Sequence, residues 1–85
     1  MGHNKRQAPA KLGRKLKSIR DHLKLTAEEL IERLNYPSIA LTRSSIYKYE
    51  KGVREPATII LLKYARLVNV STDILIDDEL ELPFK

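Results

Sequence analysis

The sequence predicts an all-α fold in which five short helices form one compact domain. Apolar residues recur at spacings of three and four along most of the chain, which is the period of helices that bury one face. Residues typical of helix ends stand between these stretches, and no stretch alternates as a strand would. The length of 85 residues and the hydrophobic content of 42% suit one small domain with one core. We expect a flexible basic arm at 1–9, the helical domain at 10–76 and an acidic tail with interspersed apolar residues at 77–85.

The first helix is expected from about residue 10 to residue 24. Pro9 suits the first turn of a helix because its missing N–H would have no partner there. The apolar face is formed by Leu12, Leu16, Ile19 and Leu23. The basic residues that fall off this face are Lys11, Arg14, Lys15 and Lys17.

The second helix follows in "LTAEELIERL". Thr26 is its predicted N-cap, and Glu29 three residues later completes a capping box. Its apolar face is Leu30, Ile31 and Leu34. Asn35 can end it in a left-handed conformation, and the segment "NYPSIAL" is a connector whose shape the sequence leaves open.

The third helix is expected at 43–51, and two residues could cap it. Thr42 is the favoured N-cap, although Ser44 could also serve. Gly52 ends the helix. Within it, Ile46 and Tyr49 fall on one face and should point to the core.

The fourth helix is expected to open at Pro56, after the loop "VREP", and to end at Asn69. Its sequence "ATIILLKYARLV" is apolar almost all round, which predicts a central, buried helix. Ser71 can cap a short fifth helix, "TDILI".

The outward face of the third helix carries bases and hydroxyls and no acid. Arg or Lys can bond guanine O6 and N7, Ser can bond bases or phosphates, and a tyrosine ring can touch a thymine methyl group. Residues near the start of a recognition helix usually reach base edges. We therefore predict base contacts by Arg43, Ser44, Tyr47 and Lys48. The alternative is a polar face that is merely solvated.

The charge distribution points to a polyanionic partner. Residues 1–54 carry thirteen basic and five acidic residues, whereas residues 55–85 carry three and six, within a net charge of +5. There is no cysteine, and His3 and His22 are too few for a metal site. We see no catalytic set, so we expect neither an enzyme nor a cofactor. With no apolar run long enough for a membrane and no signal sequence, we expect a cytoplasmic protein.

Taken together, "LGRKLKSIRDHLKLTAEELIERL" and "TRSSIYKYEKGVREPATIILLKYARLVNVSTDILI" resemble the Cro/CI-type, or XRE, helix-turn-helix family. The resemblance covers roughly residues 11–76 and implies a lambda-repressor-like domain. It implies that the second and third helices bind DNA, with the third in the major groove. It also implies a salt bridge from Arg20 to Glu50. The residues agree, since Arg20 flanks an apolar stripe and a charge at a core margin should be paired.

The sequence departs from the family pattern at three points. Ala27 stands where the family commonly has a phosphate-binding glutamine, so only backbone N–H groups near Thr26 and Ala27 could hold a phosphate there. Ile31 replaces a small alanine, which could move the second and third helices apart. The interval from Leu30 to Ile46 is sixteen residues, about five more than usual, so either the second helix or the turn at 35–42 must be longer.

Other basic residues are candidates for phosphate contacts, which position a protein on DNA without reading sequence. These candidates are Lys51, Arg54, Lys11 and Arg14, with Lys5 and Arg6 of the arm. Each could equally be a solvated surface cation.

The tail residues Leu80, Leu82 and Phe84 could cover the domain's own core or pack against a second copy. We expect a homodimer, because helix-turn-helix proteins usually read two half-sites. The outer face of the fourth helix, at Ile60, Tyr64 and Leu67, would add apolar surface to the interface.

The sequence therefore predicts a sequence-specific, double-stranded-DNA-binding transcription regulator of bacterial or phage type. Repression is favoured over activation, because so short a chain has little surface for recruiting polymerase. Two alternatives are an antitoxin, which binds DNA and a toxin, and a helical module that binds protein alone.

Overall fold

The computed structural model describes residues 9–84 and contains five α-helices within that range. The helices are α1 (Leu12–Leu23), α2 (Ala27–Leu34), α3 (Arg43–Lys51), α4 (Thr58–Leu67) and α5 (Thr72–Ile76). No strand occurs in the described range, so the all-α prediction is confirmed. Of the predicted arm, residues 1–8 lie outside the described residues, and His3, Lys5 and Arg6 are among them.

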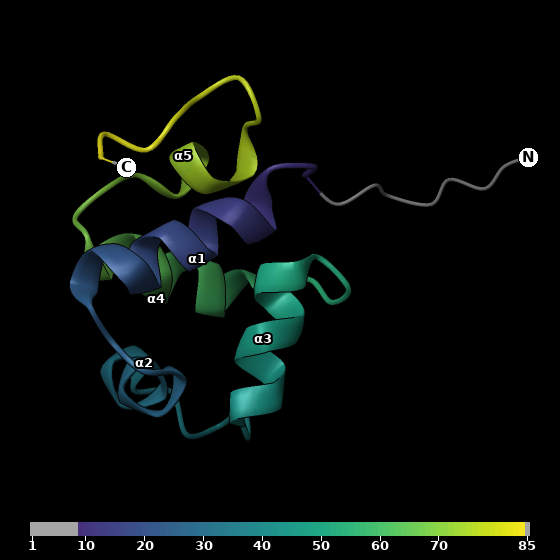
Figure 1. Ribbon diagram of the computed structural model, residues 1–85, viewed down its shortest axis with the longest axis vertical. Helices are drawn as coiled ribbons and strands as arrows, with labels where there is room; N and C mark the ends of the chain where they lie inside the picture. Colours follow the sequence, from purple (N-terminus) through teal and green to yellow (C-terminus); the bar gives the residue numbers. More distant parts are fainter. Residues whose placement is uncertain (1–8, 85) are drawn as a thin grey trace, which may run out of the picture.

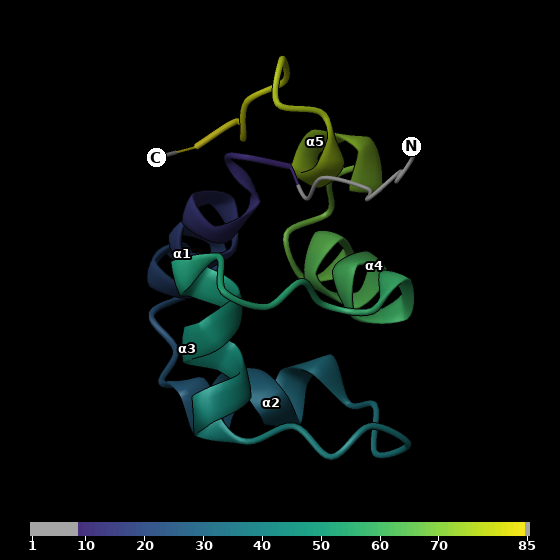
Figure 2. The same cartoon turned by 90° about the vertical axis from the view of Figure 1, so that its right-hand side faces the viewer.

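The helices surround one core. In Figure 1, α1 crosses the middle of the molecule in front of α4, with α2 and α3 below it and α5 and the C-terminal segment above it. The side view separates α1 from α4 and shows α3 standing between the levels of α1 and α2 (Figure 2). The buried apolar residues are Leu12, Leu16, Ile19, Ala27, Leu30, Leu34, Ile46, Tyr49, Ile60, Leu61, Tyr64, Ala65 and Leu75. Ile31 is only partly buried and packs against the edge of this core.

The helix ends follow local capping chemistry, and α1 and α4 are each slightly shorter than predicted. Thr26 and Glu29 form the expected capping box, and Asn35 ends α2 with φ 49°. The end of α1 is set by Lys24, which takes the left-handed conformation at φ 58°. The start of α4 was predicted two residues early, because Pro56 is followed by Ala57 in an extended conformation and the helix begins only at Thr58.

The predicted apolar outer face of α4 is wrong. Ile60 and Tyr64 are fully buried, with exposed fractions of 0%. Of the three residues expected there, Leu67 alone retains some exposure. Because α4 lies behind α1 and is covered on several sides, its helical period does not identify an outward face (Figure 1).

Lys15 was predicted to lie off the buried face of α1, and this is also wrong. Its side chain is 2% exposed. The Nζ ammonium donates hydrogen bonds to the carbonyl oxygens of Ile74 at 2.7 Å and Asp77 at 2.9 Å. These carbonyls stand at the end of α5, where helix carbonyls lack internal partners and favour a cation. The long apolar stem of lysine can be buried when its charged end is satisfied in this way.

The C-terminal segment packs along its own domain. The Asp78 carboxylate accepts hydrogen bonds from the backbone N–H groups of Ala10 and Lys11, at 2.9 and 3.0 Å. Farther along, the ring of Phe84 stacks on His22 with 3.9 Å between centroids. Leu82 and Phe84 thus cover the domain itself, whereas Leu80 remains 38% exposed.

Candidate nucleic-acid interface

Helix α3 is fixed at both ends by residues that the sequence identifies. The Thr42 hydroxyl accepts a hydrogen bond from the backbone N–H of Ser45 at 3.2 Å, and the Ser45 hydroxyl accepts one from the N–H of Thr42 at 3.1 Å. Thr42 is therefore the N-cap, and Ser44 does not cap the helix. Gly52 ends the helix with φ 78°, a left-handed conformation that suits glycine. Ile46 and Tyr49 are buried as expected.

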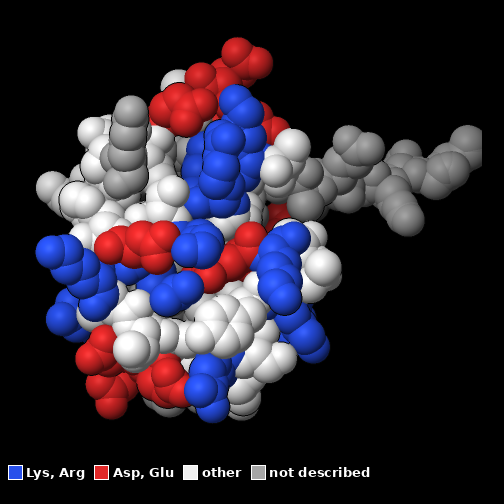
Figure 3. Space-filling model, viewed as in Figure 1, with Lys and Arg blue, Asp and Glu red and all other residues white. Residues whose placement is uncertain are grey.

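The opposite face of α3 is open to solvent. The four residues expected to contact bases, Arg43, Ser44, Tyr47 and Lys48, are all exposed. Tyr47 is 41% exposed, which is unusual for so large an apolar ring in this molecule. Figure 3 shows lysine and arginine side chains spread over the face that contains α1 and α3, with acidic groups between them and at its upper and lower edges.

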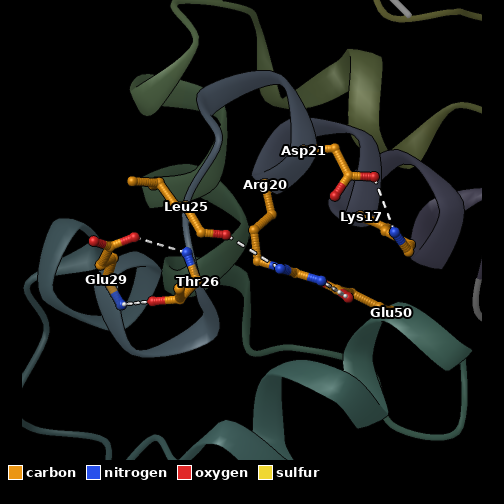
Figure 4. A network of polar contacts seen from close by, with 7 residues as sticks. All are labelled: Lys17, Arg20, Asp21, Leu25, Thr26, Glu29 and Glu50. Atoms are coloured by element: carbon orange, nitrogen blue, oxygen red, sulfur yellow. Dashed lines mark hydrogen bonds and ion pairs between the residues drawn. The ribbon is translucent and has the colours of Figure 1, made fainter.

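Arg20 and Glu50 are brought together at the junction of α1 and α3. Arg20 Nε donates to Glu50 Oε2 at 2.7 Å, and Nη2 donates to Oε1 at 3.0 Å. Nη1 donates to the carbonyl of Leu25 at 3.1 Å, so the guanidinium links α1, the start of α2 and α3 (Figure 4). The side chains are 15% and 5% exposed. The hydrogen bond to Glu50 raises the pKa of Arg20, so the guanidinium stays charged.

The same guanidinium supports one of the outward residues. The Arg20 Cζ atom lies 5.8 Å from the centroid of the Tyr47 ring, which is within cation–π range. Tyr47 therefore rests on a cation that is itself held by hydrogen bonds. This contact restricts the ring on the exposed face of α3.

The start of α2 offers backbone N–H groups beside two acids. The Thr26 hydroxyl already accepts from Glu29 N at 3.1 Å, and Glu29 Oε1 accepts from Thr26 N at 2.8 Å (Figure 4). Ala27 is 1% exposed, and its methyl side chain cannot donate a hydrogen bond to a phosphate. Any phosphate here would meet N–H groups of the first turn and also the carboxylates of Glu28 and Glu29.

Three of the four basic phosphate candidates in the described range lie close together. Arg14, Lys51 and Arg54 line a depression of about 340 Å³ between the start of α1 and the end of α3. Lys11 is drawn toward the tail instead, with its Nζ 3.5 Å from Glu81 Oε2. At the floor of this junction α1 and α3 nearly touch, because a Cβ atom on Gly13 would lie 2.6 Å from the carbonyl oxygen of Glu50.

The extra residues between the second and third helices enlarge the turn rather than the helix, since α2 ends at Leu34 and α3 begins at Arg43. Tyr36, Ile39 and Leu41 of the turn are partly buried against the core. With Ile31, they line a groove of about 420 Å³. The turn thus packs its large apolar side chains against the core and leaves a partly apolar groove beside α2.

One contact had no signal in the sequence. Arg43 Nε lies 3.2 Å from Glu28 Oε2, which joins the first residue of α3 to the first turn of α2. The sequence alone could not pair these two residues, because they lie fifteen positions apart and it leaves the shape of the turn between their helices open.

Among the described residues, no cluster of His, Asp or Glu could hold a metal ion. No described helix is both long enough and apolar enough to cross a membrane.

Comparison with known proteins agrees with this geometry. A family model described as helix-turn-helix matches residues 16–75, which include all of α2 and α3. The HTH-type transcriptional regulator ImmR of Bacillus subtilis (strain 168) is 38% identical over 65 residues, which cover 76% of this chain and 47% of the relative. The chain thus spans about half the length of this relative. No solved structure matches it significantly. The chain belongs to the helix-turn-helix family of the Cro/CI, or XRE, type.

Proposed function

We propose that this protein is a transcription regulator that binds double-stranded DNA sequence-specifically and acts as a repressor. The observation that carries the proposal is the exposed face of α3, on which Arg43, Ser44, Tyr47 and Lys48 are all open to solvent. The helix behind this face is capped at both ends and tied to α1 by Glu50. A rigid helix with donors on its outer face can enter the major groove and read base edges. The relative in Bacillus subtilis is a transcriptional regulator, which supports this role.

Phosphate contacts would come from the rim of the same surface. Arg14, Lys51 and Arg54 lie together at the far end of α3 from Arg43. The first-turn N–H groups of Ala27 and its neighbours are at the other end, and Lys11 could join only by leaving Glu81. Phosphate-binding donors at both ends of a recognition helix would fix its register along the groove.

The first test is selection of bound duplexes from a random pool, with affinity for the winners measured against salt. We expect a consensus with two-fold symmetry and a log–log salt slope of about −0.9 for each neutralised phosphate. Arg43→Ala should relax one base position at a cost of roughly 1–3 kcal/mol. Lys51→Ala should weaken binding to every duplex alike. Weak binding without a consensus would refute recognition by α3.

A homodimer remains part of the proposal, with Leu80 kept from the surface first expected and Ile76 of α5 in place of the buried residues of α4. Ile76 in α5 is 45% exposed and Leu80 is 38% exposed, and both are large apolar side chains. We expect sedimentation equilibrium to show a dimer that Ile76→Asp converts to a monomer. Val53→Asp is the matched control, since Val53 is 71% exposed in the loop after α3. A wild-type monomer on DNA as well as in solution would exclude the dimer.

A second candidate is recognition of a protein partner, as by an antitoxin or an interaction module. The groove beside the enlarged turn favours it, because Ile31, Tyr36, Ile39 and Leu41 offer apolar surface there. A module that binds protein alone has no salt-dependent affinity for DNA, whereas an antitoxin keeps it. The salt titration therefore separates these alternatives.

A further inference from the structure

The first residue of α3 is paired with an acid of α2. Arg43 Nε lies 3.2 Å from Glu28 Oε2, and the two side chains are 65% and 60% exposed. Solvent screens such a pair, so it contributes little to the stability of the fold. Glu28 also takes no part in the capping box of α2, which is formed by Thr26 and Glu29. The pair is therefore not needed to hold the helices.

The location of the pair matters more than its strength. Arg43 begins α3, which has no acid in its first turn. A cation at this positive end of a helix is electrostatically unfavourable, and Glu28 compensates it from the neighbouring helix. Glu28 itself stands where the first turn of α2 offers N–H groups to a phosphate, so its carboxylate weakens attraction of DNA to that point.

The chemistry of the contact leaves Arg43 able to read a base. Glu28 approaches Nε, and Arg43 has no other polar partner among the described residues. The terminal nitrogens Nη1 and Nη2 therefore remain for a second acceptor pair. Guanine presents such a pair as O6 and N7 in the major groove, and a planar fork matches both at once.

We infer that Glu28 is a positioning residue that makes Arg43 a reader of sequence rather than a contact to phosphate. The inference rests on the proposed function. An Arg43–Glu28 pair has no net charge, so it adds little to the sequence-independent attraction between protein and DNA. Without the carboxylate, Arg43 could turn to the nearest phosphate, which every sequence provides. Glu28 thus lowers affinity for all DNA and raises the difference between the right and wrong sites.

The test compares Glu28→Gln with Glu32→Gln in the full chain. Glu32 lies one turn later on α2, is exposed, and has no ion pair in the described structure, so it controls for the loss of one negative charge. Three duplexes are used: the selected consensus, the consensus changed at the base pair that Arg43→Ala relaxes, and an unrelated sequence. Affinity for each is measured over a range of salt concentrations. Circular dichroism melts confirm that each variant is folded.

Glu28→Gln should bind the unrelated duplex more tightly, with a salt slope steeper by up to about 0.9. Its preference for consensus over the changed duplex should fall about two- to fivefold, the range of an exposed ion pair. Glu32→Gln should keep the wild-type preference. In an Arg43→Ala background, Glu28→Gln should cause no further loss of preference, because the residue it positions is absent.

Unchanged preference in Glu28→Gln would overturn the inference while leaving the proposed function intact. An equal loss in Glu32→Gln would also overturn it, since the effect would then come from net charge. If the wild-type protein distinguishes no duplexes, the proposed function itself fails and the inference fails with it.

Discussion

The substitution Gly13→Ala should change stability through two opposing effects, a gain in helix propensity and a steric overlap with α3. In a helix interior, alanine is more favourable than glycine by up to about 1 kcal/mol. Against this, the added Cβ would lie 2.6 Å from the carbonyl oxygen of Glu50 and 3.0 Å from that of Tyr49, whereas ordinary contact begins at 3.4 Å. Both obstacles are backbone atoms of α3, so relief requires the helices to separate.

The expected result is a net loss of stability. Overpacking of this kind costs about 1–3 kcal/mol, and the displaced residue, Glu50, also holds the ion pair to Arg20 at 2.7 Å. Because both close contacts are with backbone atoms, the cost should lie in the upper part of that range, at about 2–3 kcal/mol. Subtracting about 1 kcal/mol for helix propensity leaves an expected loss of about 1–2 kcal/mol. For a domain of this size that corresponds to a fall in Tm of roughly 4–16 °C.

The assay is urea and thermal unfolding followed by circular dichroism. Gly52→Asn is the matched control, because nothing lies within 4 Å of a Cβ there and asparagine tolerates φ 78°. It should remain within about 1 kcal/mol of wild type. A Gly13→Ala protein as stable as wild type would refute the idea that glycine sets the separation of α1 and α3.

Three further changes probe groups that the fold buries or caps. Tyr64→Phe should leave stability unchanged or raise it by about 1 kcal/mol, because the Tyr64 hydroxyl is buried without a hydrogen-bond partner among the described residues; a clear loss in urea unfolding would reveal a partner for it. Lys15→Met should cost about 2–4 kcal/mol in the same assay, because two carbonyls at the end of α5 lose a charged donor; a neutral result would mean that water replaces the ammonium. Asp78→Asn should destabilise at neutral pH, because hydrogen bonds from the start of α1 lower the pKa of Asp78 below its ordinary 3.8. That contribution is present above pH 3.8 and is lost as the pH falls through the lower folded-state pKa, so the difference in Tm should disappear in acid.

Features determined by neighbouring residues were predictable from the sequence. The capping box at Thr26, the N-cap at Thr42 and the glycine stop at Gly52 depend on residues within four positions, and the structure has them as expected. The reciprocal hydrogen bond from Thr42 N to the Ser45 hydroxyl was not predicted. The inward turn of Ile46 and Tyr49 follows from helical period alone. The same helical period places Arg43, Ser44, Tyr47 and Lys48 on the outward face of α3, so this candidate surface could be proposed from the sequence alone.

Features determined by distant segments were not predictable. Lys15 looks exposed on a helical wheel because the wheel omits α5, whose end supplies its two acceptors. Tyr64 looked like an outer residue of α4 because the wheel omits the helices around it. The pairing of Arg43 with Glu28 depends on the conformation of the enlarged turn, which sets how the start of α3 lies against α2. The amino-acid composition of a turn says little about its conformation.

The clamp made by Asp78 and Lys15 has a consequence for how the domain opens. Its hydrogen bonds join residues 59 to 68 positions apart, so they close almost the whole described chain into a loop. Such contacts bear a large entropic cost and form only when most of the chain is already ordered. The start of α1 and the end of α5 should therefore open together as one cooperative unit. In hydrogen exchange, the amides of Ala10 and Lys11 should exchange in step with this unit, while those of α3 remain protected until the whole domain unfolds.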